Sequence, residues 1–282
     1  MTTPTPGVLY VVATPIGNLG DMSARGVETL RTCDRIVAED TRRTRTLLSH
    51  FAIVGKPLGA IHEHSSPQAI SRCVEQLCSG ESIALVTDAG APVVSDPGDA
   101  VVSAAIAAGI RVIPIPGASA VIAALMASGV TGDGGFRFVG FLPRDGVARR
   151  DAIALVCDTP ETVVLFESAN RLAATLRDLA DATPTRPACI ARELTKLHEE
   201  FVRGNLANLA AIDREWIGEV VIILGAYKPA ERDEQISDEA LDGRIDQELK
   251  AGGHAKAIAE KLAAWCGRPK RAVYERVVSR KR

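Results

Sequence analysis

Short runs of aliphatic residues alternate with longer segments whose apolar positions recur every three or four residues through the first half of the chain. The short runs predict strands and the longer segments predict helices. Strands are expected at 8–13, 35–38, 83–87 and 112–115, and helices at 24–32, 41–51, 68–79, 98–108 and 119–128. This alternation is typical of a mostly parallel sheet with helices on its faces.

The pattern changes after a glycine-rich segment at 129–135, which is the best candidate for a domain boundary. Beyond it, predicted strands follow one another more closely, at 136–141, 162–167, 188–192, 199–202 and 219–224. Helices are expected at 147–157, 171–179 and 206–212. The chain is therefore expected to hold a first α/β domain over 1–130 and a second, α+β domain over 131–228.

The remainder, 229–282, is expected to be a linker followed by three short helices. Its first ten residues are polar, which favours a linker. The apolar positions expected to face inward in the second and third helices are Ile258, Leu262, Trp265, Val273 and Val277. The turn between these helices contains a glycine and a proline, and the pattern is similar to a helix-turn-helix.

Charge is distributed unevenly along the chain. The whole chain carries −2, but residues 250–282 hold ten lysines and arginines against two acids, a local charge of +8. A basic tail on an acidic body indicates a polyanionic partner, although a solvated helix face would have the same composition. The basic side chains expected to point outward are Arg268, Lys270, Arg271 and Arg276.

The overall composition is that of an ordinary globular protein, with 46% hydrophobic and 24% charged residues. The longest apolar run, at 118–127, is far shorter than the roughly 20 residues that cross a bilayer. Residues 1–7 lack the charged start and apolar middle of a signal peptide, so a cytoplasmic location is expected. The six cysteines form no Cys-x-x-Cys pair, which argues against a zinc site.

Three loops follow the ends of predicted strands, where open α/β sheets bind ligands. In the first, at 13–23, Gly17 and Gly20 allow a tight backbone course, and Ser23 can cap the next helix. Pro15 stands where the first glycine of a dinucleotide fingerprint would fall. An NAD-dependent dehydrogenase is correspondingly disfavoured.

The second loop, at 87–98, is the most specific of the three. Gly90 lets a ligand approach the main chain, and Asp96 followed by Pro97 predicts an N-cap with proline at the first helical position. The third loop is built of small residues and offers the hydroxyl of Ser119. None of the loops contains a metal-ligand cluster or a phosphate-binding lysine. We therefore expect backbone groups and small side chains to hold the ligand, without a metal.

Eight motifs occur in order between residues 8 and 225. They are Thr14-Pro-Ile-Gly-Asn18, Glu39-Asp-Thr-Arg42, Asp88-Ala-Gly-x-Pro92, Ser95-Asp-Pro-Gly98, Pro116-Gly117, Gly140-Phe-Leu-Pro143, Phe166-Glu-Ser168 and Arg192-Glu-Leu-Thr-Lys196. Together they resemble the ribosomal RNA small-subunit methyltransferase I family of the tetrapyrrole methylase superfamily. The basic helical tail is similar as well.

The resemblance implies the two-domain fold of these class III methyltransferases, with S-adenosylmethionine between the domains, a small C-terminal helical domain and a homodimer. It also implies 2′-O-methylation of a cytidine in the decoding centre of 16S rRNA. By position, the cofactor pocket is expected to use Ile16, Ala89, Gly90, Ala91, Val94, Ser119, Ala120, Phe166, Glu167, Leu194, Val220 and Val221.

The implied methyl transfer depends mainly on the alignment of the ribose hydroxyl with the methyl group of the cofactor. The sulfonium already makes the methyl group electrophilic, so no metal is required, while the ribose hydroxyl must be aligned and lose its proton. Lys196 with Glu199 is the preferred catalytic pair, because a lysine beside the site could stabilise the developing alkoxide. A salt bridge at an exposed strand end is the alternative interpretation of these two residues.

Basic side chains near the motifs are candidates for contacts with RNA phosphates. The pair His62-x-His64 lacks a third metal ligand at a suitable spacing, so contact with RNA is preferred there too. The predicted RNA-contacting residues are Arg42, Arg43, Arg45, His62, His64, Arg144, Arg149, Arg150, Arg171, Lys270 and Arg271. Solvated helix faces are the alternative for each cluster.

Two other functions compete with rRNA methylation. A tetrapyrrole C-methyltransferase on the same fold would keep the cofactor loops but need neither the basic tail nor the arginine clusters. A non-catalytic RNA-binding protein would need the tail but not the ordered cofactor loops.

Overall fold

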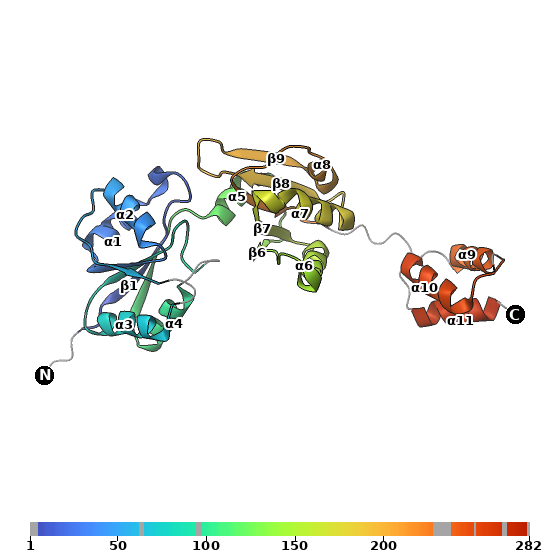
Figure 1. Ribbon diagram of the computed structural model, residues 1–282, viewed down its shortest axis with the longest axis horizontal. Helices are drawn as coiled ribbons and strands as arrows, with labels where there is room; N and C mark the ends of the chain where they lie inside the picture. Colours follow the sequence, from blue (N-terminus) through green and yellow to red (C-terminus); the bar gives the residue numbers. More distant parts are fainter. Residues whose placement is uncertain are drawn as a thin grey trace. The chain divides into compact units, whose positions relative to one another are not determined.

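The computed structural model describes residues 5–61, 65–93, 98–227, 238–250, 252–266 and 270–280. It forms two compact units, Met1–Tyr227 and Lys228–Arg282. The first unit contains two five-stranded sheets, and the described part of the second is helical (Figure 1).

The first sheet is parallel throughout and has the strand order β3-β2-β4-β1-β5. Its strands are β1 (Val8–Val12), β2 (Arg35–Ala38), β3 (Leu58–Ala60), β4 (Ile83–Val86) and β5 (Arg111–Ile115). The helices that connect them are α1 (Ala24–Thr32), α2 (Thr41–His50), α3 (Pro67–Cys78) and α4 (Asp99–Ala107), with a short 3₁₀ turn η1 (Leu19–Asp21) before α1.

Strand β4 shows why both faces of this sheet are covered. All four of its residues are buried. Ala84 and Val86 join the apolar cluster that includes α1 and α2, whereas Ile83 and Leu85 join the cluster with α3 and α4. Side chains of a strand alternate between faces, so a continuous aliphatic run needs helices on both sides (Figure 1). The predicted doubly covered parallel sheet is confirmed.

Strand β3 was absent from the predicted elements. It is three residues long, contains Gly59, and lies at the edge of the sheet, where it pairs only with β2. Its pairing with β2, rather than any aliphatic run, makes it a strand, so no local pattern indicates it.

The capping of α4 differs from the prediction. The helix begins at Asp99 and Gly98 occupies the N-cap position with φ 131°. The predicted N-cap at Asp96, with Pro97 as the first helical residue, is therefore wrong, and Ser95–Pro97 lie outside the described residues. The predicted cap of α1 is confirmed, since Ser23 Oγ accepts a hydrogen bond from the Gly26 N–H at 3.1 Å.

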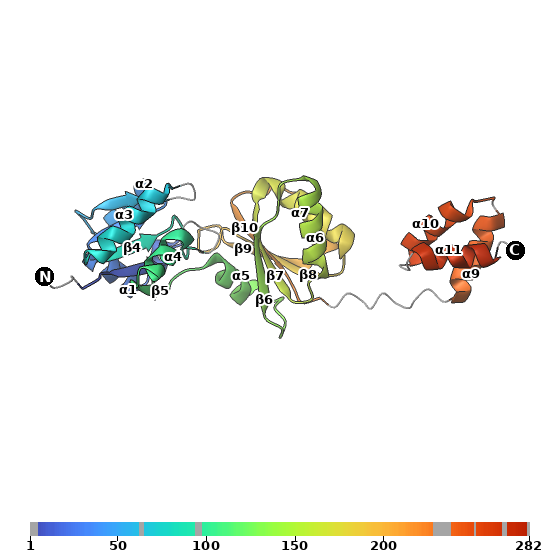
Figure 2. The ribbon, with the colours of Figure 1, turned by 90° about the horizontal axis from the view of Figure 1, so that it is seen from below.

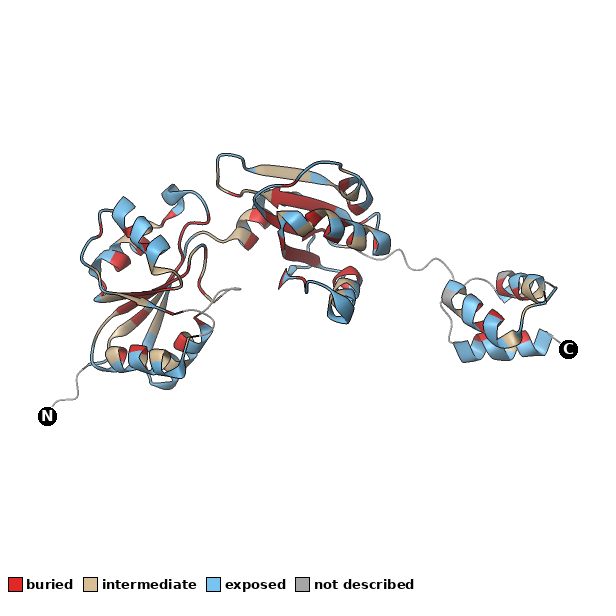
Figure 3. Cartoon of the chain, viewed as in Figure 1, coloured by how far each residue is buried: buried red, intermediate tan, exposed pale blue. Residues whose placement is uncertain are grey.

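The second sheet is mixed and has the order β6-β7-β10-β8-β9. Its strands are β6 (Phe136–Phe141), β7 (Thr162–Ser168), β8 (Pro187–Arg192), β9 (Glu200–Asn205) and β10 (Glu219–Leu224). Only β6 and β7 are parallel; the other neighbours are antiparallel. The central strands form the buried core (Figure 3).

Helices cover both faces of the second sheet. One face packs against α6 (Gly146–Asp158), α7 (Ala169–Ala182) and α8 (Leu206–Ala210), and Figure 2 shows α6 and α7 together on that side. The other face packs against α5 (Ala120–Ser128), whose Val121 and Ala124 contact the cluster that contains Val221. Helix α5 follows the last strand of the first sheet but is buried against the second, and this places its first turn between the two sheets.

The second unit consists, in its described part, of α9 (Asp238–Lys250), α10 (Ala255–Cys266) and α11 (Lys270–Arg280). The three predicted short helices are present, and Ile258, Leu262, Val273 and Val277 are buried as expected. Trp265 departs from the prediction. It is 38% exposed, and the guanidinium of Arg244 lies 4.3 Å from its ring centre, so this indole packs under a cation at the surface.

Within the described residues, no helix has the length and apolar character needed to cross a lipid bilayer.

Candidate active site

A cavity of about 610 Å³ lies where the strand ends of the first sheet and the start of α5 meet the second sheet. Its lining is mostly apolar and contains two carboxylates, and none of its described residues is lysine or arginine. The lining residues are Ile16, Ala89, Ala120, Phe141, Phe166, Glu167, Ser168, Ala169, Asn170, Leu194, Gly218, Glu219, Val220 and Val221.

Eight of the twelve residues predicted for the cofactor pocket line this cavity. They are Ile16, Ala89, Ala120, Phe166, Glu167, Leu194, Val220 and Val221. Gly90, Ala91 and Ser119 do not line it, and Val94 lies outside the described residues. Phe141 and Ser168 were missed although both stand in quoted motifs, and Glu219 directly precedes two predicted residues. All three stand at or next to the ends of predicted strands, and that position was the signal in the sequence that could have identified them.

Gly90 and Ser119 shape the loops instead of lining the cavity. Gly90 exchanges two backbone hydrogen bonds with Thr14, at 2.8 and 3.1 Å, and holds φ at 85°. That conformation favours glycine, and it joins the loop after β4 to the loop after β1. Ser119 is the N-cap of α5, and its hydroxyl accepts the Ile122 N–H at 3.5 Å.

Gly17 allows the loop after β1 to pack directly on the loop after β8. A Cβ atom at Gly17 would lie 2.5 Å from Cγ of Lys196, so no other residue fits without a shift. The Asn18 N–H donates to Thr195 Oγ1 at 3.1 Å. Thr195 and Glu193 have φ of 65° and 52°, a left-handed conformation that costs of order 1–3 kcal/mol for each such residue. The two strained residues flank Leu194, whose side chain lines the cavity.

The predicted catalytic residues Lys196 and Glu199 have different partners. Glu199 accepts the Thr195 N–H at 2.6 Å and so supports the strained loop. It does not line this cavity or the smaller second cavity described below. The ammonium of Lys196 bonds to Glu193 at 2.8 Å and to Glu219 at 3.0 Å. Burial disfavours the charged lysine, but these two bonds outweigh it and raise the pKa of Lys196. The bond from Lys196 likewise lowers the pKa of Glu193.

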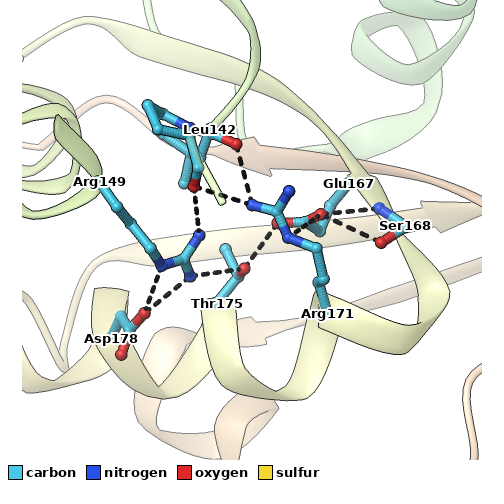
Figure 4. Close-up of polar contacts among 8 residues, drawn as sticks. Leu142, Arg149, Glu167, Ser168, Arg171, Thr175 and Asp178 are labelled. Atoms are coloured by element: carbon cyan, nitrogen blue, oxygen red, sulfur yellow. Dashed lines mark hydrogen bonds and ion pairs between the residues drawn. The ribbon is translucent and has the colours of Figure 1, made fainter. Parts of the chain in front are cut away.

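Glu167 lines the larger cavity, and its side chain is 1% exposed. Its carboxylate accepts the Ser168 N–H at 2.8 Å and the Thr175 hydroxyl at 2.6 Å, and it lies 3.3 Å from Arg171 (Figure 4). A buried charge is tolerated only with partners of this kind. The network ties the end of β7 to the first turns of α7.

Arg149 and Arg171, which were predicted as RNA contacts, belong to the same network within the protein. Arg171 donates to the carbonyl of Leu142 at 2.9 Å, and Arg149 donates to that of Pro143 at 3.2 Å (Figure 4). Arg149 is also paired with Asp178 at 2.7 Å and is only 12% exposed. Both guanidinium groups therefore hold the loop after β6.

A second cavity of about 340 Å³ adjoins the first, with which it shares Ile16, Ala89 and Glu219. It is more polar and contains charges of both signs. Its lining residues are Thr14, Pro15, Ile16, Gly17, Leu19, Arg43, Thr44, Thr46, Leu47, Thr87, Asp88, Ala89, Lys196 and Glu219. Lys196 lines only the second cavity, and its partner Glu219 lines both.

Asp88 is held in this second cavity by neighbours from two strand ends. Its carboxylate accepts the Asp40 N–H at 3.1 Å and lies 3.3 Å from the guanidinium of Arg43. Glu39 accepts the Thr87 hydroxyl at 2.8 Å and the Asp88 N–H at 3.3 Å. Burial, followed by repulsion from Glu39, raises the pKa of Asp88 above its ordinary value.

The other predicted RNA-contacting residues are at the surface or undescribed. Arg42 pairs with Asp40 at 2.8 Å, while Arg45, Arg144 and Arg150 are exposed. His62 and His64 lie outside the described residues.

In the second unit, the acidic helix α9 pairs with the basic helix α11. Arg276 bonds to Asp238 and Asp242, and Arg280 bonds to Asp242 and Asp246. Arg276, which was predicted to point outward, is therefore paired with α9 and only partly exposed. Arg268 lies outside the described residues. Lys270 and Arg271 are exposed, with Glu260 and Glu275 as their partners. Helix α9 contains five acids, so the charge of +8 counted from residue 250 overstates that of the folded unit.

Among the described residues, no group of three His, Cys, Asp or Glu side chains is arranged to hold a metal ion.

Comparison with known proteins identifies relatives over most of the chain. The profile of the tetrapyrrole (corrin/porphyrin) methylases matches residues 8–210. Ribosomal RNA small subunit methyltransferase I of Xylella fastidiosa (strain Temecula1) is 44% identical over 275 residues, which cover 96% of this chain and 98% of that protein. The protein of the same name from Halalkalibacterium halodurans is 42% identical over 272 residues, with 95% and 93% covered.

Solved structures share the fold at lower sequence identity. A diphthine synthase has a TM-score of 0.59 and 18% identity, and the match covers 78% of this chain and 90% of that one. Uroporphyrin III C-methyl transferase from Thermus thermophilus has a TM-score of 0.55 and 17% identity, with 78% and 97% covered. At these identities the likeness concerns the fold alone. The fold and the close relatives agree, and the chain belongs to the tetrapyrrole methylase family and, within it, to the family of ribosomal RNA small subunit methyltransferase I.

Proposed function

We propose that this chain transfers a methyl group from S-adenosylmethionine to the ribose 2′-hydroxyl of a cytidine in the decoding centre of 16S rRNA. The observation that carries the proposal is the junction of two unlike cavities. An apolar cavity with carboxylates and no described lysine or arginine meets a smaller cavity that presents Arg43 and Lys196. The first suits a cationic cofactor, and the second suits a phosphate-bearing substrate.

The larger cavity fits S-adenosylmethionine in size and in chemistry. Its volume of about 610 Å³ lies within the range of small-molecule sites, about 300–1,000 Å³. Ile16, Leu194 and Val221 would hold the apolar parts of the cofactor, and Glu167 and Glu219 offer negative charge toward its cationic groups. When bound, the cofactor supplies an electrophilic methyl group, so the protein has to align and deprotonate the acceptor.

Lys196 is the residue proposed to stabilise negative charge that develops on the ribose oxygen. It lines the second cavity, and its ammonium is already held in place by Glu193 and Glu219. A preorganised cation costs no reorganisation as the charge develops. Glu199 is proposed as a positioning residue that supports the loop through the Thr195 N–H.

The exposed arginines near the cavities would contact the RNA backbone. Arg43 lines the second cavity, and the solvent-exposed residues proposed to extend the phosphate track from the first unit are Arg42, Arg45, Arg144 and Arg150. In the second unit, Lys270 and Arg271 are proposed to bind phosphates, because their acidic partners are themselves exposed and such pairs exchange readily. The relatives align over 95–96% of the chain, which includes most of this unit.

A homodimer in the cytoplasm, with 16S rRNA or the small ribosomal subunit as partner, completes the proposal. Exposed apolar side chains on α5, Ile122 and Met126, are compatible with a subunit interface.

The deciding experiment compares methyl transfer to small ribosomal subunits with transfer to uroporphyrinogen III. The mass of nucleolytic fragments then locates the methyl group on the rRNA. Transfer to a cytidine ribose supports the proposal. Transfer only to the porphyrinogen would establish the tetrapyrrole alternative, and binding of RNA without cofactor binding, measured by calorimetry, would establish a non-catalytic protein.

A further inference from the structure

Three carboxylates line the two cavities among the described residues: Glu167, Glu219 and Asp88. A methyl acceptor hydroxyl must lose a proton, and a carboxylate that receives it must be both sheltered and open to the ligand. Glu167 is 1% exposed and already has Thr175, Arg171 and the Ser168 N–H as partners. Glu219 is 78% exposed and its carboxylate is bonded to Lys196. Neither offers an oxygen that is both sheltered and open to a ligand.

Asp88 differs from both in its surroundings. Its side chain is 22% exposed, faces the second cavity and immediately precedes Ala89, which lines both cavities. One carboxylate oxygen accepts the Asp40 N–H, and this bond fixes the orientation of the group. Within the described residues, the other oxygen lies 3.3 Å from the guanidinium of Arg43 and has no second hydrogen-bond partner.

Arg43 is a partner that an incoming phosphate can remove. Its side chain is 71% exposed, and a pair with so exposed a member contributes only about 0–1 kcal/mol. A phosphate of the RNA backbone offers the guanidinium a stronger, charge-assisted pair. Substrate binding would therefore draw Arg43 away and leave one oxygen of Asp88 free.

We propose that Asp88 accepts the proton of the attacking ribose hydroxyl, and that its pair with Arg43 is exchanged for a substrate phosphate. This inference rests on the proposed function. In the step, the 2′-oxygen forms a bond to the methyl carbon as the bond from that carbon to sulfur breaks. The electron pair of the broken bond remains on sulfur, which becomes a neutral thioether, and the hydroxyl proton moves to the Asp88 carboxylate.

The charged groups around Asp88 are suited to this role. Burial and then repulsion from Glu39, at the end of β2, disfavour the charged carboxylate and raise the pKa of Asp88. Arg43 on α2 opposes the effect while it remains paired. Loss of Arg43 to the substrate therefore makes Asp88 a better base at the moment when it is needed.

The test uses the full chain with intact small ribosomal subunits and Asp88→Asn, which retains an oxygen for the Asp40 N–H. Single-turnover transfer should fall by about 10²–10⁴, the usual contribution of a general base. Cofactor affinity by calorimetry and the melting temperature should stay near the parent values. The exposed Asp99→Asn serves as the matched control. In the parent the rate should fall as pH decreases and Asp88 is protonated, and Asp88→Asn should lack this dependence.

A second variant separates a base from a structural group. Added formate should partly restore transfer by Asp88→Ala, whereas chloride at equal ionic strength should not. Transfer by Asp88→Asn within threefold of the parent rate would overturn the inference. A slow Asp88→Asn that also binds cofactor weakly, together with no rescue of Asp88→Ala by formate, would overturn it as well. An inactive parent would instead overturn the proposed function on which it rests.

Discussion

Replacement of Lys196 by methionine separates a catalytic lysine from a structural one. Methionine keeps most of the unbranched side chain but removes the ammonium, which bonds to Glu193 at 2.8 Å and to Glu219 at 3.0 Å. If the ammonium stabilises charge that develops on the ribose oxygen, the rate of methyl transfer should fall by about 10²–10³. An interaction made mainly in the transition state lowers kcat and leaves KM nearly unchanged.

The contacts of Lys196 set the structural cost of the same replacement. Glu219 is 78% exposed, so solvent screens that pair and it contributes a few tenths of a kcal/mol. Glu193 is 20% exposed, and it keeps the bond from the Glu219 N–H when the lysine is lost. The two pairs together stabilise the fold by about 1 kcal/mol. For a unit of this size that corresponds to a fall in Tm of about 2–4 °C.

The assay is single-turnover methyl transfer at saturating cofactor and small subunits, with Tm measured on the same samples. Arg31→Met is the control, because Arg31 pairs with Glu28 on the exposed face of α1 and lines neither cavity. A Lys196→Met rate within about threefold of the parent, with Tm lowered by a few degrees, would refute the catalytic role. Lys196 would then be a structural residue of the strained loop.

Three further predictions concern the cofactor, the tail and acid stability. Ala120→Phe should fill the larger cavity and weaken cofactor binding at least tenfold by calorimetry, whereas Ala127→Phe, exposed on the same helix, should not. Equal affinities would contradict the placement of the cofactor. Removal of 228–282 should weaken rRNA binding and lower its salt slope by about 2, one for each lost phosphate contact of the tail; unchanged slopes would leave the tail without an RNA role. Arg214 lowers the pKa of Glu200 to about 2 from 4.5, so this pair stabilises the fold above pH 4.5 and ceases to do so as pH falls toward 2. The stability deficit of Arg214→Gln in urea unfolding, about 0.2–1 kcal/mol, should therefore shrink over that interval, and a constant deficit would contradict the assignment.

Gly90→Val would be a poor test of the cofactor pocket, for a reason that only the fold reveals. Gly90 has φ 85° and exchanges backbone hydrogen bonds with Thr14 beside the cavity. Valine at such a φ is strained, so the variant would disturb the junction of two loops as well as ligand binding. Ala120, in the first turn of a regular helix, accepts a larger side chain without this strain.

Local patterns determined most of the secondary structure. Helix α1 and strands β2, β6 and β10 lie within the predicted bounds, because periodicity, capping by Ser23 and turn residues act over a few neighbouring positions. The loops that line the larger cavity were also identified in the sequence, since ligand sites of α/β sheets lie beyond strand ends. The order of the motifs likewise predicted the family, which the comparisons confirmed.

Only the tertiary structure decided which basic side chains are paired with acidic groups inside the protein. Arg149, Arg171 and Arg276 have the same character in the sequence as the exposed Arg144 and Arg150. Their partners lie elsewhere in the fold: Asp178 is 29 residues from Arg149, and Asp242 is 34 from Arg276. Local periodicity contains no information about such separations, so a basic cluster indicates a phosphate track and a structural network equally well.

The same reason explains why the sequence favours Lys196 and Glu199 over Asp88 as catalytic residues. The sequence shows Asp88 as one member of a loop motif, whereas its environment comes from Glu39, Asp40 and Arg43, more than 40 residues away. The parallel pairing of β2 with β4 brings their carboxyl ends together and so creates this cluster of charges. Residue type and local spacing determined the elements and the family, while strand order determined which side chains share a cavity, because contacts between distant segments exist only after the sheet has formed.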